Sequence, residues 1–212
     1  MEKEVDIAAN SITLPGTLAL SEKAGGVVLF AHGSGSSRFS KRNRYVAGVL
    51  QKAEIGTLLF DLLTQEEDQV YETRFNIGLI TERLIKATEW LAGQDEAKGL
   101  AFGYFGASTG AAAAMRAAAV LGKQVKAVVS RGGRPDLAME VLPQIEAPTL
   151  LIVGARDEVV LDLNRQACEK LKTTKNLEII PGATHLFEEP DTLELAAKAA
   201  AAWFKKYLTP LD

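Results

Sequence analysis

Short apolar runs alternate with segments of helical periodicity along most of the chain. Each run is bounded by glycine, proline or charged residues, which is typical of strands buried in a sheet. The runs are Val27–Ala31, Thr57–Asp61, Leu100–Phe105, Ala127–Ser130, Thr149–Gly154 and Leu177–Ile180. Between two of them, Ile77–Leu91 repeats apolar residues on one helical face. This alternation predicts the α/β class, with a mostly parallel sheet covered by helices on both faces.

The two ends of the chain add further elements to this pattern. Val5–Ala8 and Ile12–Leu20 enclose an Asn-Ser and a Pro-Gly pair and contain no helical pattern, so they predict an antiparallel edge of the sheet. Residues 196–207 carry one apolar face and predict a last helix. Asp191 is its predicted N-cap, because Glu194 follows three residues later as in a capping box.

The chain is expected to form a single domain over residues 1–212. Its 212 residues lie in the range where one α/β domain is common, and no repeat or linker tract interrupts them. The longest candidate insertion, Leu62–Asn76, is short and polar. We expect it to be a loop, so the fold has no cap domain.

Composition argues against several classes of partner. The formal net charge of −3 gives no broad basic field for nucleic acid. Cys168 is the only cysteine, which excludes an internal disulfide and a cysteine-based metal site and is typical of a reducing cytoplasm. No signal-peptide pattern or membrane-length apolar run is present. We therefore expect a soluble cytoplasmic protein that binds neither nucleic acid nor membrane, and its oligomeric state stays open.

The candidate nucleophile follows the run Leu100–Phe105, because ligand sites of open parallel sheets lie beyond the carboxyl ends of the strands. There the chain reads Gly-Ala-Ser-Thr-Gly over residues 106–110, before an alanine-rich helical segment. A sharp strand-to-helix turn presents the central Ser108 above the sheet, and the Thr109 N–H at the helix start would face an oxyanion. With 18 glycines the motif also arises by chance, but the strand before it and the helix after it favour catalysis.

A serine hydroxyl needs an adjacent base, and the chain has two histidines. A structural role is the usual alternative for either. The order serine, acid, histidine in this type of fold selects His185 as the base, since His32 precedes Ser108. His32 begins a His-Gly-Ser-Gly loop, which predicts a second oxyanion-binding N–H from Ser34, or alternatively from Gly35.

The acid of the triad is expected after the run Thr149–Gly154. Asp157 stands there and is the predicted residue that orients the histidine. Glu158 and Asp162 are nearby alternatives, and each of the three acids could instead be a solvated loop residue or a helix cap.

These residues resemble the α/β-hydrolase superfamily, and within it the small, cap-less dienelactone-hydrolase-like branch. The resemblance covers nearly the whole chain and rests on segments 32–37, 106–110, 154–157 and 182–187. It implies an esterase or related serine hydrolase that needs no metal or organic cofactor. Dienelactone hydrolases proper use a cysteine nucleophile where this chain has Ser108, so the dienelactone substrate does not carry over. We expect a carboxylesterase acting on a small ester.

Other functions share parts of this pattern. A thioesterase, an amidase or an acyltransferase would use the same triad, and a non-catalytic binding module would keep only the fold. A dinucleotide-binding protein would need G-x-G-x-x-G after the first parallel strand. Gly33 and Gly35 match this fingerprint, but Arg38 stands in place of its third glycine.

Basic residues cluster after two of the predicted strands. They are Arg38, Lys41, Arg42 and Arg44 after the first parallel strand, and Arg131 and Arg134 around a Gly-Gly pair. They could recognise a substrate carboxylate or phosphate, or pair with the acidic residues Glu66, Glu67, Asp68 and Glu72. We favour pairing for most of them. Arg131 is the exception and a candidate substrate-binding residue, because it directly follows an apolar strand.

Overall fold

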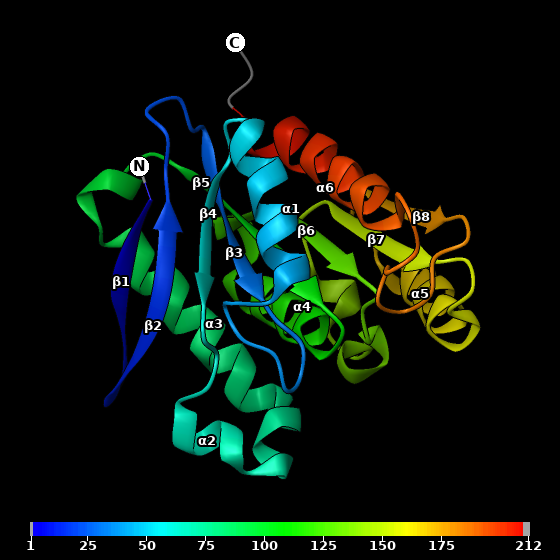
Figure 1. Ribbon diagram of the computed structural model, residues 1–212, viewed down its shortest axis with the longest axis horizontal. Coiled ribbons are helices and arrows are strands. Elements are labelled where there is room, and N and C mark those ends of the chain that lie inside the picture. The colour runs from blue at the N-terminus through cyan, green and yellow to red at the C-terminus, as the bar shows by residue number, and fades with distance from the viewer. Residues whose placement is uncertain (1, 210–212) are drawn as a thin grey trace.

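The computed structural model describes residues 2–209. They build an eight-stranded sheet in the order β1-β2-β4-β3-β5-β6-β7-β8 (Figure 1). The strands are β1 (Glu2–Ala9), β2 (Ile12–Ala19), β3 (Gly26–Ala31), β4 (Gly56–Phe60), β5 (Ala101–Ala107), β6 (Val125–Arg131), β7 (Thr149–Gly154) and β8 (Lys175–Ile180). β1 and β2 are antiparallel and the other six strands are parallel. The predicted class and the antiparallel edge are therefore confirmed.

Helices cover both faces of the sheet. They are α1 (Lys41–Lys52), α2 (Gln65–Gln69), α3 (Ile77–Ala92), α4 (Thr109–Leu121), α5 (Glu158–Lys170) and α6 (Thr192–Leu208). In Figure 1, α1 and α6 lie in front of the sheet, and α3 and α4 lie behind it. None of the helices in residues 2–209 combines the length and apolarity needed to cross a bilayer.

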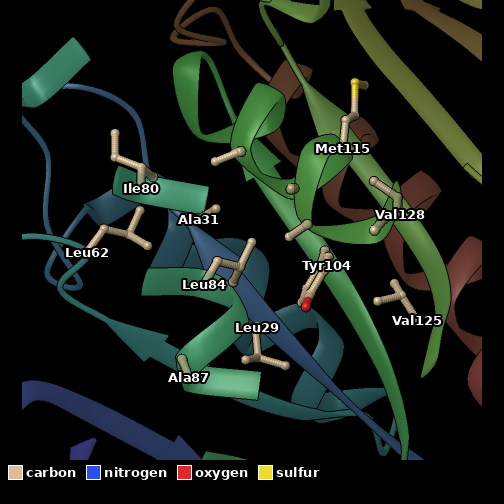
Figure 2. Close-up of a cluster of buried hydrophobic side chains, with 14 of the residues drawn as sticks. Leu29, Ala31, Leu62, Ile80, Leu84, Ala87, Tyr104, Met115, Val125 and Val128 are labelled. Atoms are coloured by element: carbon tan, nitrogen blue, oxygen red, sulfur yellow. The ribbon is translucent and has the colours of Figure 1, made fainter. Parts of the chain in front are cut away.

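The strands bury side chains on both faces because they are apolar without interruption. In β3, Leu29 belongs to the core under α3 and α4, whereas its neighbours Val28 and Phe30 belong to the core under α1 and α6. Figure 2 shows the first of these cores, where Leu29 and Tyr104 of the sheet face Leu84 of α3. Each buried leucine contributes about 1.5–3 kcal/mol to folding.

The prediction of a loop at Leu62–Asn76 is wrong. The segment forms α2 and a 3-10 helix, Tyr71–Phe75. α2 begins with a capping box in which Thr64 and Glu67 satisfy each other's backbone N–H groups. The sequence carries only a weak signal for this box, because no apolar run follows it and α2 buries none of its residues.

The predicted capping box at α6 is also wrong. Asp191 occupies the N-cap position, but its side chain makes no capping hydrogen bond. Its φ of 64° is left-handed, in place of the extended backbone that N-cap residues usually adopt. Glu194 instead pairs with Lys198, one turn along the helix.

The contact between α4 and the end of β3 predicts a difference between two glycines. A Cβ on Gly110 would lie 2.1 Å from the Ala31 carbonyl oxygen and 2.5 Å from that of His32. Gly110→Ala should therefore lower the free energy of unfolding by more than about 2 kcal/mol. Gly48→Ala in α1, where a Cβ meets nothing within 4 Å, should raise it by roughly 0.5–1 kcal/mol. Urea unfolding of both variants measures the contrast, and equal effects would contradict this packing.

Candidate active site

Ser108 is the single residue between β5 and α4, and its backbone is strained. Its φ of 51° and ψ of −122° lie where residues with a side chain are rarely found. The turn closes because Gly106 has no Cβ, which would lie 2.4 Å from Cα of Ala111. The Ser108 N–H donates to the Arg131 carbonyl and the Ser108 carbonyl accepts from the Arg134 N–H. These bonds hold the serine at the carboxyl edge of the sheet.

His185 lies on the loop after β8 and meets Asp157 after β7. The distance from His185 Nδ1 to Asp157 Oδ2 is 2.7 Å. Gly154 permits this approach, since a Cβ there would lie 2.3 Å from the Ala183 carbonyl oxygen. The Asp157 side chain is 13% exposed and that of His185 is 37% exposed. With Nδ1 donating to the carboxylate, Nε2 of the neutral ring is left as the free base.

The two alternative acids are not in this arrangement. Glu158 is exposed at the start of α5. Asp162 is exposed and pairs with Arg165, with Oδ1 2.9 Å from Nη1. Of the three candidates, Asp157 is the one hydrogen-bonded to His185.

Ser108 and His185 line one open pocket of about 370 Å³, here called the Ser108 pocket. Its other lining residues are Gly33, Ser34, Ser36, Ser40, Arg42, Asn43, Phe75, Ala107, Thr109, Arg131, Arg134 and Leu186. No hydrogen bond joins the Ser108 hydroxyl to His185 among those of residues 2–209. Catalytic hydrogen bonds are often long in a free enzyme and shorten when substrate binds.

The predicted oxyanion donors differ in their hydrogen bonding. The Thr109 N–H has no hydrogen-bond partner within residues 2–209. The Ser34 N–H, in contrast, donates to Oγ1 of Thr109 at 2.9 Å, so it is not free in this structure. The Ser34 hydroxyl donates to the Arg74 carbonyl at 3.1 Å, which ties this loop to the 3-10 helix. Gly35, the alternative donor, has a left-handed φ of 65°.

His32 is buried outside the Ser108 pocket and holds the loop of residues 32–35 in place. Its Nδ1 donates to the Gly33 carbonyl at 3.0 Å, and Nε2 accepts from the Leu62 N–H at 3.2 Å. These two bonds require the neutral ring. Burial lowers the pKa of His32, and the bond to Gly33 opposes this only in part.

Arg131 lines the Ser108 pocket and is 7% exposed. Its Nε and Nη1 have no hydrogen-bond partner within residues 2–209, and Nη2 lies 3.5 Å from Oδ1 of Asn43. The guanidinium carbon lies 5.6 Å from the centre of the Phe187 ring. Arg134 differs, because Asp136 binds it through two hydrogen bonds of 2.8 and 2.7 Å.

Most of the clustered arginines pair with acids, but not with the predicted ones. Arg38 pairs with Glu4 and Asp61, and Arg42 pairs with Glu188. Of the acids predicted to neutralise them, Glu67 pairs with Arg83 and Asp68 pairs with Arg74. The reason is that α2 turns these acids toward α3 and the 3-10 helix, an arrangement that the loop prediction did not contain.

Sequence reasoning missed Asn43, Phe75 and Leu186, which also line the pocket. Asn43 is 2% exposed and begins the buried face of α1. A signal was present, since a polar residue occupied the first position of an otherwise apolar face. Within residues 2–209, no group of three or more His, Cys, Asp or Glu side chains is placed to hold a metal ion.

Comparison with known proteins identifies relatives of this chain. Residues 41–209 match the model of the dienelactone hydrolase family. The chain belongs to the dienelactone hydrolase family. A dienelactone hydrolase from Anabaena variabilis ATCC 29413 is 53% identical over 98% of both chains, with a TM-score of 0.96. Est1E from Butyrivibrio proteoclasticus is 16% identical, covers 96% of this chain and 98% of its own, and shares the fold with a TM-score of 0.82.

The dienelactone hydrolase family and the esterases of the same fold identify the chain as an α/β-hydrolase. A Mycobacterium tuberculosis H37Rv protein, "Putative phosphoribosyl transferase Rv0571c", is 55% identical over 207 residues. The match covers 98% of this chain and 47% of that protein. The chain thus spans about half the length of this curated relative.

The buried neutral His32 predicts a pH dependence of stability. Its folded pKa lies below the ordinary value, so the unfolded chain binds a proton more readily and stability is lost as the pH falls below about 6.5. Wild type should lose up to about 1.4 kcal/mol per pH unit more than His32→Gln, which can still accept the Leu62 hydrogen bond. Urea unfolding at pH 7.5, 6.5 and 5.5 measures this difference. Parallel pH profiles for the two proteins would refute it.

Proposed function

We propose that this chain is a serine hydrolase of the carboxylesterase type, with Ser108 as nucleophile, His185 as base and Asp157 as the orienting acid. The observation that carries the proposal is the 2.7 Å bond between His185 and Asp157, beside the pocket that the strained Ser108 also lines. Three different strand ends supply these residues. We also treat residues 1–212 as one hydrolase domain.

The first half of the reaction forms an acyl-enzyme. Ser108 Oγ attacks the ester carbonyl carbon while His185 Nε2 takes the hydroxyl proton, and the carbonyl electron pair moves to oxygen. Asp157 stabilises the imidazolium that forms. The intermediate then collapses, the bond to the alcohol oxygen breaks, and His185 returns the proton to that oxygen. Water repeats the sequence in the second half and releases the acid, so the chain's own side chains and water suffice.

The oxyanion of this intermediate needs two N–H donors. The Thr109 N–H, at the start of α4, is free to donate and benefits from the helix dipole. The second donor in this proposal is Ser34, whose N–H now points at Thr109 Oγ1. The oxyanion replaces that hydroxyl as the acceptor, and charge makes it the stronger one.

In this proposal, the activity in the name of the M. tuberculosis relative resides in the part of that protein that the present chain does not match. The matched half carries an α/β-hydrolase fold, whereas the unmatched half is long enough for a separate activity. We therefore do not assign phosphoribosyl transfer to this chain.

Four variants test the triad on a neutral ester such as p-nitrophenyl acetate. Ser108→Ala and His185→Ala should lower kcat/KM by roughly 10⁴-fold or more, because nothing else supplies the nucleophile or the base. Asp157→Asn should cost roughly 10²–10⁴-fold, because serine and histidine remain. Glu158→Gln is the matched control and should stay within about threefold of wild type.

Three results would contradict the proposal. If Ser108→Ala kept activity within tenfold of wild type, Ser108 would not be the nucleophile. A silent Asp157→Asn together with a crippled Glu158→Gln would mean that the neighbouring acid orients the histidine. A wild type inactive on ester, thioester and amide substrates alike would favour a non-catalytic binding module.

A further inference from the structure

One side of the Ser108 pocket carries a buried positive charge that has no counter-ion among the described residues 2–209. Arg131 is 7% exposed, and two of its three guanidinium nitrogens have no hydrogen-bond partner. Its third nitrogen reaches the neutral side chain of Asn43. Burying an unpaired charge is costly, so buried arginines are normally matched by carboxylates. Arg131 therefore places an uncompensated charge beside the pocket, although Nε and Nη1 themselves are shielded from water.

The N-terminus of α1 adds to this positive potential from the neighbouring side. Ser40, the N-cap of this twelve-residue helix, lines the pocket together with Arg42 and Asn43. The first turn contains no acidic residue and instead carries Lys41 and Arg42. Basic residues at the positive end of a helix dipole are unfavourable for the helix itself. Their presence favours a site built to attract anions.

No acidic residue offsets this charge from within the pocket lining. The fourteen lining residues include Arg42, Arg131 and Arg134 but no aspartate or glutamate. Asp136 neutralises Arg134 with two hydrogen bonds, and Glu188, 66% exposed, lies 3.3 Å from Arg42. Burial, with Arg42 nearby, lowers the pKa of Arg131 to about 10, so it stays charged at neutral pH. The unmatched charge is concentrated around Arg131 and the α1 N-terminus.

We propose that this cationic wall, made of Ser40, Arg42, Asn43 and Arg131, binds a phosphoryl group of the ester substrate. The substrates are then small esters that carry a phosphate monoester on one of their two halves. The phosphoryl group is recognised and not transferred, because the bond that breaks is the acyl carbon–oxygen bond beside Ser108. The inference rests on the proposed function for its chemistry, but the anion site stands on the contacts of the wall alone.

The amount of charge favours a phosphoryl group over a carboxylate. A phosphate monoester carries about −1.5 to −2 charges at pH 7 and three acceptor oxygens. It can be stabilised by the buried charge of Arg131, the guanidinium of Arg42 and the helix end together. A single carboxylate has one charge and two oxygens, and would leave part of the wall unpaired. The pocket volume of about 370 Å³ suits a small substrate.

Calorimetric titration with inorganic phosphate tests the wall without any need for turnover. Wild type should bind phosphate at least about tenfold more tightly than acetate at matched ionic strength. Arg131→Gln should weaken phosphate binding about tenfold or more, since it removes the buried charge. Arg156→Gln removes one exposed positive charge outside the pocket and should bind as wild type does. If Arg131→Gln does not fold, Arg42→Gln should weaken binding at least about threefold.

A pair of substrates separates this inference from the proposed function. Wild-type kcat/KM for the p-nitrophenyl ester of 3-phosphonopropanoic acid should exceed that of the butanoate ester by about tenfold, and Arg131→Gln should remove the preference. Hydrolysis of both esters at equal rates would overturn the phosphoryl site and leave the hydrolase standing. Phosphate binding with no hydrolysis of either ester would support the anion site and overturn the proposed hydrolase activity. No phosphate binding, equal binding of acetate, or an Arg131→Gln protein that binds like wild type would each overturn the inference.

Discussion

The sharp turn at Ser108 is the constraint on which the site depends. Its left-handed backbone costs roughly 1–3 kcal/mol and persists because the surrounding packing holds it. Gly106 lets the turn close on α4, and Gly110 lets α4 rest against the carbonyl oxygens at the end of β3. One local conformation thus places a serine, the first N–H of a helix and the loop of residues 32–35 at the same edge of the sheet.

Hydrogen bonds from buried groups fix the partners of this turn. The neutral ring of His32 bonds to Gly33 and Leu62 and so anchors the loop of residues 32–35. Asp157 holds the ring of His185 from the neighbouring strand end. The bonds from Leu62 to His32 and between Asp157 and His185 join residues about thirty positions apart in sequence at the carboxyl edge of a parallel sheet. The strand order therefore matters more to the site than any single loop.

The parts predictable from sequence were those with a local signature. The strands were apolar runs, and the elbow around Ser108 and the acid after β7 each followed a run directly. The failures depended on contacts across the fold. The left-handed backbone of Asp191 and the partner of the Ser34 N–H are set by neighbours that no sequence period encodes. The partners of Glu67 and Asp68 likewise depend on α2, which the expected loop does not contain.

The central claim, that Ser108 is a nucleophile activated within this pocket, is tested most directly by covalent labelling. Wild-type protein treated with a fluorophosphonate should gain one adduct, and peptide mass spectrometry should place it on Ser108. The rate of labelling should fall steeply when His185 is replaced, because the hydroxyl then lacks its base. An adduct on another residue, or labelling of Ser108 at an equal rate without His185, would contradict the account.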